Sequence, residues 1–119
     1  MAFLRKIPEN PIIMEHFKGG AGHIENYPIL TPDEMYGKGR VCAFMKLQPG
    51  CEVGRHRHEG DCEVFYFLSG KGSYLLDGEM VPVEAGDVAF VDDGEEHFLR
   101  NDGDEVLEYL ALVLYTAQK

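Results

Sequence analysis

From Arg40 onward, short apolar runs alternate with turn-forming residues at close spacing, and this pattern limits the fold more than any other feature of the chain. Apolar runs bounded by glycine, proline and aspartate are typical of strands in an all-β sandwich or barrel. Strands are expected at residues 40–47, 64–68, 73–76, 79–83, 88–91, 97–100 and 106–115. Asp77-Gly78, between two of these ranges, is a strong hairpin signal. The sequence therefore predicts an all-β fold.

Residues 1–39 differ in kind, because prolines and glycines recur through them and leave little room for helices. Only residues 31–35 resemble a helix start, and one turn is expected there at most. We therefore expect an irregular N-terminal leader, residues 1–39, that packs as strand or loop on the barrel or on a partner subunit. Residues 40–119 form the barrel. A chain of 119 residues supports one core and one site.

Charge and composition exclude several classes of partner. The 11 Lys and Arg residues stand against 21 Asp and Glu residues, and the net charge of -10 opposes binding to nucleic acid and to anionic membranes. A helix-turn-helix is not expected either. The first apolar run is too short for a signal segment and nothing later is long enough to span a membrane, so a cytoplasmic location is expected.

Four residues have the spacing of a metal site: His56, His58, Glu63 and His97. Side chains two positions apart on a strand point to the same face, so His56 and His58 can offer two imidazoles to one ion. Turn formers at residues 59–61 would reverse the chain and return Glu63 on the next strand, while His97 would arrive from a later one. This set of three nitrogens and one oxygen suits Fe, Mn, Ni, Co or Zn, and we predict one divalent transition metal ion per chain.

With these residues in place, the chain resembles the cupins. Their first motif matches without a departure at Gly50, His56, His58, Glu63 and Gly70. Their second motif matches at Gly86, Gly94, His97 and Asn101, with Asp92 where the family has proline. That proline serves a turn, so the change affects the local loop and leaves the ligands intact. The resemblance implies a small double-stranded β-helix, or jelly-roll, barrel with a metal at its centre.

Strand alternation predicts which side chains face the interior. The inward set is Val41, Ala43, Met45, Leu47, Phe65, Phe67, Leu99, Leu107, Tyr109, Ala111 and Val113. Most of these are expected to fill the barrel, as in other small barrels. The candidates for lining a pocket are Met45, Phe65, Leu99, Tyr109 and Ala111. Tyr109 is also the candidate for proton transfer or substrate orientation.

Other polar residues receive simpler interpretations. Asp61, Asp87 and Asp92 are interpreted as turn residues. His16 and His23 match no motif, and each is interpreted as an ordinary surface or interface histidine. The cysteines at positions 42, 51 and 62 have no zinc-site spacing, and we expect free thiols that bind no metal.

Two functions from different classes remain open. The first is a metal-dependent enzyme acting on a small oxygenated metabolite, of the dioxygenase, isomerase, decarboxylase or lyase type. The alternative is a metal-dependent module that binds or senses a small molecule without turnover. In either case the outward apolar stripe, which includes Val64, Tyr66 and Leu68, predicts a homodimer built from this face and the glycine-rich leader. The resemblance to small single-domain cupins, which usually form dimers, implies the same.

Overall fold

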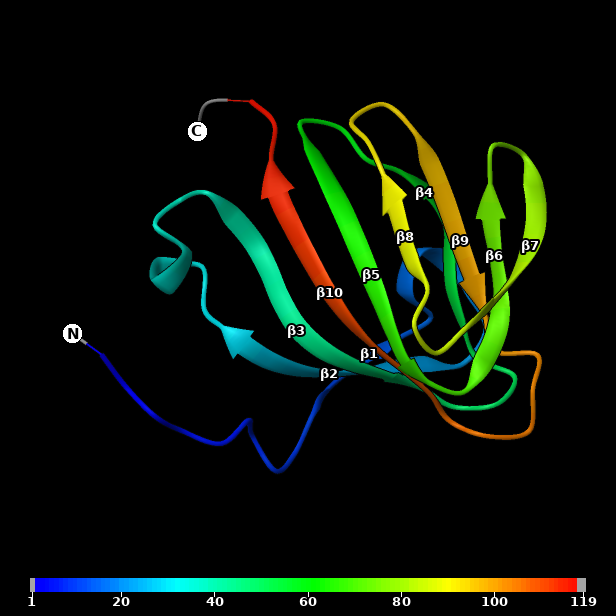
Figure 1. Cartoon of the computed structure of the whole chain (residues 1–119), viewed down its shortest axis with the longest axis horizontal. Helices are drawn as coiled ribbons and strands as arrows, with labels where there is room; N and C mark the ends of the chain where they lie inside the picture. The colour runs from blue at the N-terminus through cyan, green and yellow to red at the C-terminus, as the bar shows by residue number, and fades with distance from the viewer. Residues whose placement is uncertain (1, 118–119) are drawn as a thin grey trace.

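The computed structural model describes residues 2–117, which form ten strands in two sheets and two 3-10 turns (Figure 1). One sheet has six strands in the order β1-β2-β3-β10-β5-β8, and the other has four in the order β4-β9-β6-β7. The six-stranded sheet comprises β1 (Ile12–Glu15), β2 (His23–Leu30), β3 (Gly39–Leu47), β10 (Leu107–Tyr115), β5 (Asp61–Ser69) and β8 (Val88–Val91). The four-stranded sheet comprises β4 (Glu52–Arg57), β9 (Glu96–Arg100), β6 (Lys71–Leu76) and β7 (Glu79–Glu84). The turns are η1 (Phe17–Gly19) and η2 (Asp33–Met35). The architecture is the predicted all-β jelly-roll barrel.

Strand β10 organises the larger sheet because it pairs with β3 on one side and β5 on the other. Its inward side chains, Leu107, Tyr109, Ala111 and Val113, are at most 2% exposed. Burying a large apolar side chain of this kind stabilises a fold by roughly 1.5–3 kcal/mol. The predicted alternation is confirmed along this strand, and the core lies between the two sheets.

The hairpin between β6 and β7 has the predicted turn. Asp77 and Gly78 both adopt left-handed backbone angles, with φ of 49° and 82°, and the flanking residues Leu76 and Glu79 pair directly. Two consecutive residues with positive φ match the right-handed twist of the flanking strands, and aspartate and glycine tolerate that conformation well. The hairpin therefore follows from these two residue types.

The leader contributes two strands that the sequence ranges did not include. Strand β1 pairs with β2, and β2 pairs with β3, despite Pro28 within β2. The register of β2 shifts between Pro28 and Leu30, which is where a proline can be accommodated. Strand β4 also lies outside the expected ranges, although the metal motif required a strand at His56.

The glycine-rich part of the leader packs tightly on β4. A Cβ atom added to Gly20 would lie 2.7 Å from the Glu52 carbonyl oxygen, and one added to Gly54 would overlap the Lys18 carbonyl group. This backbone contact requires glycine, and it holds η1 beside the barrel opening. Of the two expected locations of the leader, the barrel or a partner subunit, the structure shows this glycine-rich part packed on the barrel of its own chain.

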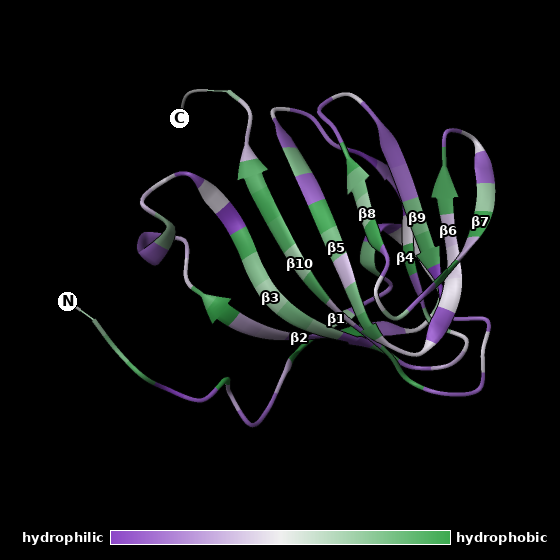
Figure 2. Ribbon diagram, in the orientation of Figure 1, coloured by the Kyte–Doolittle hydropathy of each residue, from purple (hydrophilic) through white to green (hydrophobic). Residues whose placement is uncertain are grey.

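The outer face of the six-stranded sheet carries apolar side chains on β5 and β8, and Figure 2 shows hydrophobic residues, in green, along both strands. Tyr66 pairs with Val88 and Val64 pairs with Phe90, so these four side chains adjoin one another on β5 and β8. Tyr66, Val88 and Phe90 are 44%, 65% and 52% exposed. Within the described part of the chain, no helix has the length and apolar character needed to cross a bilayer.

We expect Gly54→Ala to lower the free energy of unfolding by about 1–3 kcal/mol, the usual cost of forcing an extra methyl group into a packed contact. The methyl group would push η1 away from β4. Urea unfolding measures the change, and Gly103→Ala is the matched control, because its Cβ would meet its nearest neighbour at an ordinary 3.4 Å. Equal stability of the two variants would contradict the packing described for η1.

Candidate metal centre

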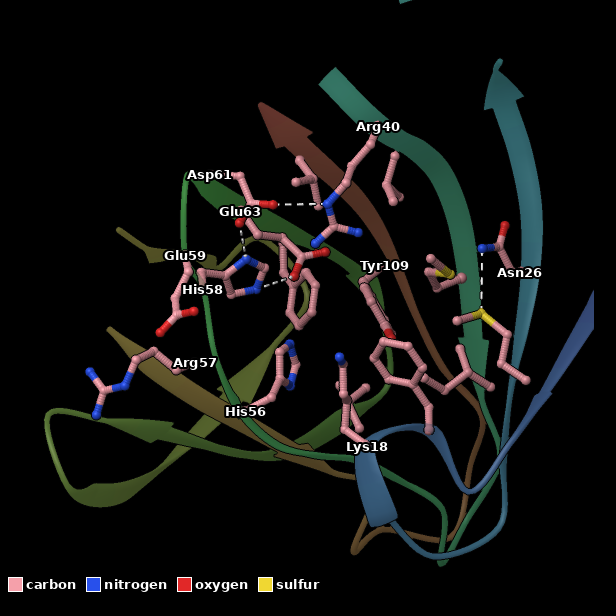
Figure 3. Close-up of a pocket in the computed structure, with 18 residues that line it drawn as sticks. Lys18, Asn26, Arg40, His56, Arg57, His58, Glu59, Asp61, Glu63 and Tyr109 are labelled. Carbon is pink, nitrogen blue, oxygen red and sulfur yellow. Dashed lines mark hydrogen bonds and ion pairs between the residues drawn. The ribbon is translucent and has the colours of Figure 1, made fainter. Parts of the chain in front are cut away.

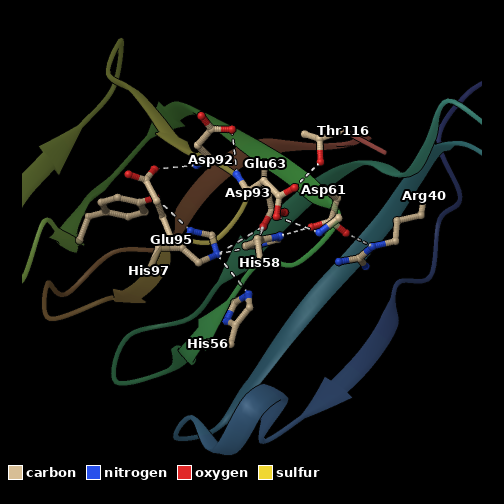
Figure 4. A network of polar contacts seen from close by, with 12 residues as sticks. Arg40, His56, His58, Asp61, Glu63, Asp92, Asp93, Glu95, His97 and Thr116 are labelled. Atoms are coloured by element: carbon tan, nitrogen blue, oxygen red, sulfur yellow. Dashed lines mark hydrogen bonds and ion pairs between the residues drawn. The ribbon is translucent and has the colours of Figure 1, made fainter. Parts of the chain in front are cut away.

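Three histidines and one glutamate converge from both sheets. His56 on β4 lies directly opposite His97 on β9 in the four-stranded sheet. His58 follows β4 at once, and its backbone N–H donates to the Glu95 carbonyl at 3.0 Å. Glu63 comes from β5 of the six-stranded sheet. The structure thus brings together the four residues that the sequence singled out (Figure 4).

The donor atoms of these side chains meet at one point. His97 Nε2 lies 3.1 Å from His56 Nε2 and 3.2 Å from His58 Nε2. Glu63 Oε1 lies 3.1 Å from His58 Nε2 and 3.4 Å from His97 Nε2. One ligand atom from each of the four residues falls within 4.8 Å of all the others.

Each imidazole is oriented by a hydrogen bond at its other nitrogen. His56 Nδ1 donates to the Gly54 carbonyl at 2.7 Å, and His58 Nδ1 donates to Asp61 Oδ1 at 2.6 Å. His97 Nδ1 lies 2.9 Å from the Tyr74 hydroxyl. A proton on Nδ1 leaves the lone pair on Nε2, which is the atom that faces the cluster.

The donor set fits a transition metal ion. Three imidazole Nε2 atoms and one carboxylate oxygen face one another at 3.1–3.4 Å, and imidazole nitrogens with a carboxylate oxygen are a donor set that divalent transition metal ions take. When two nitrogen atoms each lie about 2.1 Å from one ion and their bonds to the ion form a right angle, the nitrogens are roughly 3 Å apart. The observed nitrogen separations of 3.1 and 3.2 Å agree with that spacing. This His/Glu cluster could therefore hold a metal ion.

The protonation behaviour of the cluster also suits metal binding. Burial lowers the pKa of His56 to about 4, which keeps this imidazole neutral near pH 7. Burial opposes ionisation of Glu63, but hydrogen bonds from His58 and His97 outweigh it and lower the Glu63 pKa. Hydrogen bonding to Glu63, and then to Asp61, raises the pKa of His58. Protons and a metal ion therefore compete for this imidazole, and metal affinity should fall at acid pH.

Two residues that support the cluster were missed by the sequence analysis. The interpretation of Asp61 as a turn residue was wrong: it begins β5, is buried, and accepts hydrogen bonds from His58 and from Arg40 Nε, the latter at 2.8 Å. A signal was available, since Asp61 and Glu63 are two positions apart on one strand and so share a face. Tyr74 lay in an expected strand, but nothing in the sequence indicated its contact with His97.

The loop with the unusual aspartate is well ordered by its own polar groups. The Asp92 backbone N–H donates to Glu95 Oε1 at 2.9 Å, and the Asp93 N–H donates to Asp92 Oδ1 at 2.8 Å. Gly94 then takes a left-handed φ of 87°. Asp92 is therefore a turn residue, as predicted, and so is Asp87, which accepts from the Glu84 N–H. The loop delivers His97 without the proline.

A cavity of about 300 Å³ adjoins the cluster (Figure 3). Of the predicted lining residues, Met45, Phe65 and Tyr109 lie on its wall. Leu99 and Ala111 are instead packed in the buried core. The rest of the lining comes largely from β1, η1, β2 and β3, and it includes Met14, Phe17, Lys18, Ile24, Asn26, Arg40 and Val41.

Tyr109 lies deep in this wall between the rings of Phe65 and Phe67, with ring centroids 4.7 and 5.7 Å away. It is 1% exposed, and burial raises its pKa. The hydroxyl therefore stays protonated at neutral pH and can donate a hydrogen bond.

The remaining histidines and cysteines lie outside the cluster. His23 pairs with Glu25 at 3.0 Å, and His16 Nδ1 lies 3.1 Å from the Gly20 carbonyl. The cysteines at positions 42, 51 and 62 are free, as predicted, and none belongs to the ligand group found among the described residues.

Comparison with known proteins agrees with the fold and the site. A sequence model of the cupin domain matches residues 43–113. An oxalate-binding protein of Thermotoga maritima is 42% identical over 104 residues, which are 87% of this chain and 86% of that protein. The crystal structure of a predicted oxalate decarboxylase from T. maritima, 39% identical, superposes with a TM-score of 0.88 over 93% of this chain and 99% of that one. A cupin 2 conserved barrel protein from Salinispora arenicola, 19% identical, shares the fold with a TM-score of 0.74 over 98% of this chain and 92% of its own. The chain therefore belongs to the cupin family.

Proposed function

We propose that this protein is a metal-dependent cupin that binds a small carboxylate, either oxalate or an acid close to it. The observation that carries the proposal is the cavity of about 300 Å³, which joins the His/Glu cluster to three cationic side chains, Lys18, Arg40 and Arg57. Cations inside a cavity of a chain with a net charge of -10 favour an anionic ligand. The similarity to an oxalate-binding protein supports the same ligand class.

The chain's own residues have separable roles in this proposal. His56, His58, Glu63 and His97 would hold the ion, which when bound supplies a Lewis acid for a carboxylate oxygen. Because burial raises the pKa of Tyr109, its hydroxyl keeps its proton and can donate a hydrogen bond to the ligand. The apolar residues of the cavity wall keep water away from the ligand, as is usual in small-molecule sites.

Turnover of the bound acid is the second candidate, so that the protein would be an enzyme of the decarboxylase type. When the C–C bond of oxalate breaks and carbon dioxide leaves, the remaining carbon keeps the electron pair and takes up one proton, which gives formate. Glu59 lies on the cavity wall next to His58, and its side chain is exposed to solvent. This carboxyl group can exchange a proton with water and deliver it to the site. The likeness to a predicted oxalate decarboxylase supports this candidate.

We also propose that the protein is a homodimer. The outer apolar face formed by Val64, Tyr66, Val88 and Phe90 is of a kind that monomers rarely leave exposed. The arm formed by residues 2–11 extends away from the barrel and leaves Leu4 fully exposed (Figure 1). A second copy of the chain would cover both surfaces.

We expect wild-type protein made without an affinity tag to bind one divalent ion per chain, and His58→Ala to lose it. Asp61→Asn should weaken metal affinity about tenfold, because the carboxylate that orients His58 loses its charge. Elemental analysis and competition with a chelator measure both effects. His23→Ala, outside the cluster, is the control and should bind metal normally. A folded wild type that cannot be loaded with Fe, Mn, Ni, Co or Zn would contradict the assignment.

We expect oxalate to bind the metal-loaded protein with at least about tenfold higher affinity than the chelator-stripped protein, because one carboxylate oxygen would bind the ion. Isothermal titration calorimetry compares the two forms. The same samples, assayed for formate and carbon dioxide, separate binding from turnover. Equal affinity in both forms, or no binding of any small carboxylate, would refute the proposed function.

Light scattering coupled to size exclusion should report twice the chain mass for the wild type. Tyr66→Lys should shift the mass toward the monomer, because a lysine amine would have to be desolvated in an apolar interface. Its metal content should stay unchanged, since Tyr66 and the ligand Glu63 point to opposite faces of β5. A monomeric wild type at micromolar concentration would rule out this interface.

A further inference from the structure

One buried carboxylate fixes both a metal-cluster imidazole and an arginine of the cavity wall. Asp61 Oδ1 accepts from His58 Nδ1 at 2.6 Å, and Asp61 Oδ2 accepts from Arg40 Nε at 2.8 Å. The Asp61 side chain is 7% exposed, whereas the Arg40 side chain is 46% exposed and stays in contact with water. The two hydrogen bonds hold the guanidinium of Arg40 at a set place relative to the metal cluster.

The rest of that guanidinium faces the cavity without a partner. Arg40 Nη1 and Nη2 make no hydrogen bond to any group of residues 2–117. Figure 3 shows them turned into the cavity, on the side of Glu63. A planar pair of N–H groups with a fixed orientation matches the two oxygens of a carboxylate.

The second arginine of the cavity wall is differently engaged. Arg57 donates to the Gly94 carbonyl and to Glu96 Oε1, and Figure 3 shows it directed away from Arg40. The lysine of the wall, Lys18, lies on η1, with its Nζ 5.7 Å from the Phe17 ring. Lys18 can therefore add positive charge, but it lacks the fixed geometry that Asp61 gives to Arg40.

We propose that Arg40 recognises a second carboxylate of the ligand, so that the site selects dicarboxylates over monocarboxylates. This inference rests on the proposed function and deepens it. One carboxylate binds the metal, and the other accepts two hydrogen bonds from Arg40 Nη1 and Nη2. Asp61 orients the guanidinium in advance, which reduces the entropy lost on binding. A monocarboxylate of the same size leaves these N–H groups without an acceptor, so it binds with lower affinity.

The test uses matched ligands and matched variants of the metal-loaded protein. Calorimetry compares oxalate with glycolate, malonate with 3-hydroxypropionate, and succinate with butyrate. The wild type should prefer at least one dicarboxylate over its monocarboxylate partner by about tenfold or more. Arg40→Gln should lower the affinity for that dicarboxylate about 10- to 100-fold, which is the range for charge-assisted hydrogen bonds. The affinity for the matched monocarboxylate should change less than about threefold.

Two further variants separate geometry from charge. Arg40→Lys keeps the charge but loses the paired donors, so it should recover part of the affinity and little of the selectivity. Arg57→Gln removes the other cavity arginine and should leave selectivity unchanged. Metal content and thermal unfolding, measured for every variant, verify that the cluster and the fold persist.

The possible failures are distinguishable. A wild type that binds none of these acids overturns the proposed function and this inference together. A wild type that binds them without preferring a dicarboxylate overturns the inference alone. If Arg40→Gln keeps the full preference for dicarboxylates, or if Arg57→Gln loses as much of that preference as Arg40→Gln does, the role of Arg40 is overturned. The proposed function then still stands.

Discussion

The convergence of three imidazole nitrogens on one carboxylate is the constraint on which the rest of the site depends. His56 and His97 come from one sheet and Glu63 from the other, so the cluster exists only when the two sheets face each other in register. Contacts at each Nδ1 then orient the three imidazoles so that their Nε2 atoms meet. A bound cation would replace the contacts among these nitrogens and Glu63 with bonds to one ion. Metal binding and folding should therefore stabilise each other.

Much of this arrangement follows from strand alternation in the sequence. The spacing of His56 and His58 indicates two ligands on one face, and the turn formers after them indicate that Glu63 returns on another strand. The same period of two places the inward residues of β10 in the core, where they are buried. Alternation indicates toward which face of the sheet a side chain points. For predicting metal ligands, that direction is most of the information needed.

Alternation does not tell what lies across the barrel from a given side chain. The contacts of Tyr74 with His97 and of Arg40 with Asp61 were for this reason not predicted from the sequence, although each orients the site. The strands of the leader were missed because Pro28 and the glycines opposed a regular element, and pairing with β3 overrode that local preference. Asp61 was misinterpreted because aspartate is common in turns, whereas its spacing from Glu63 would have placed it beside the cluster.

In the proposed function, different parts of the chain would bind the metal and select the ligand. The four candidate metal ligands lie between residues 56 and 97, inside the match to the cupin domain at residues 43–113. Lys18, Asn26 and Arg40, which also line the cavity, lie before that match. Membership of the family therefore explains the metal cluster and leaves the ligand open. The relative from T. maritima is more informative, because an alignment over 104 of 119 residues must extend through the segment from residue 16 to Arg40. In the proposed function, the residues that select the acid lie largely in this segment and not among the metal ligands.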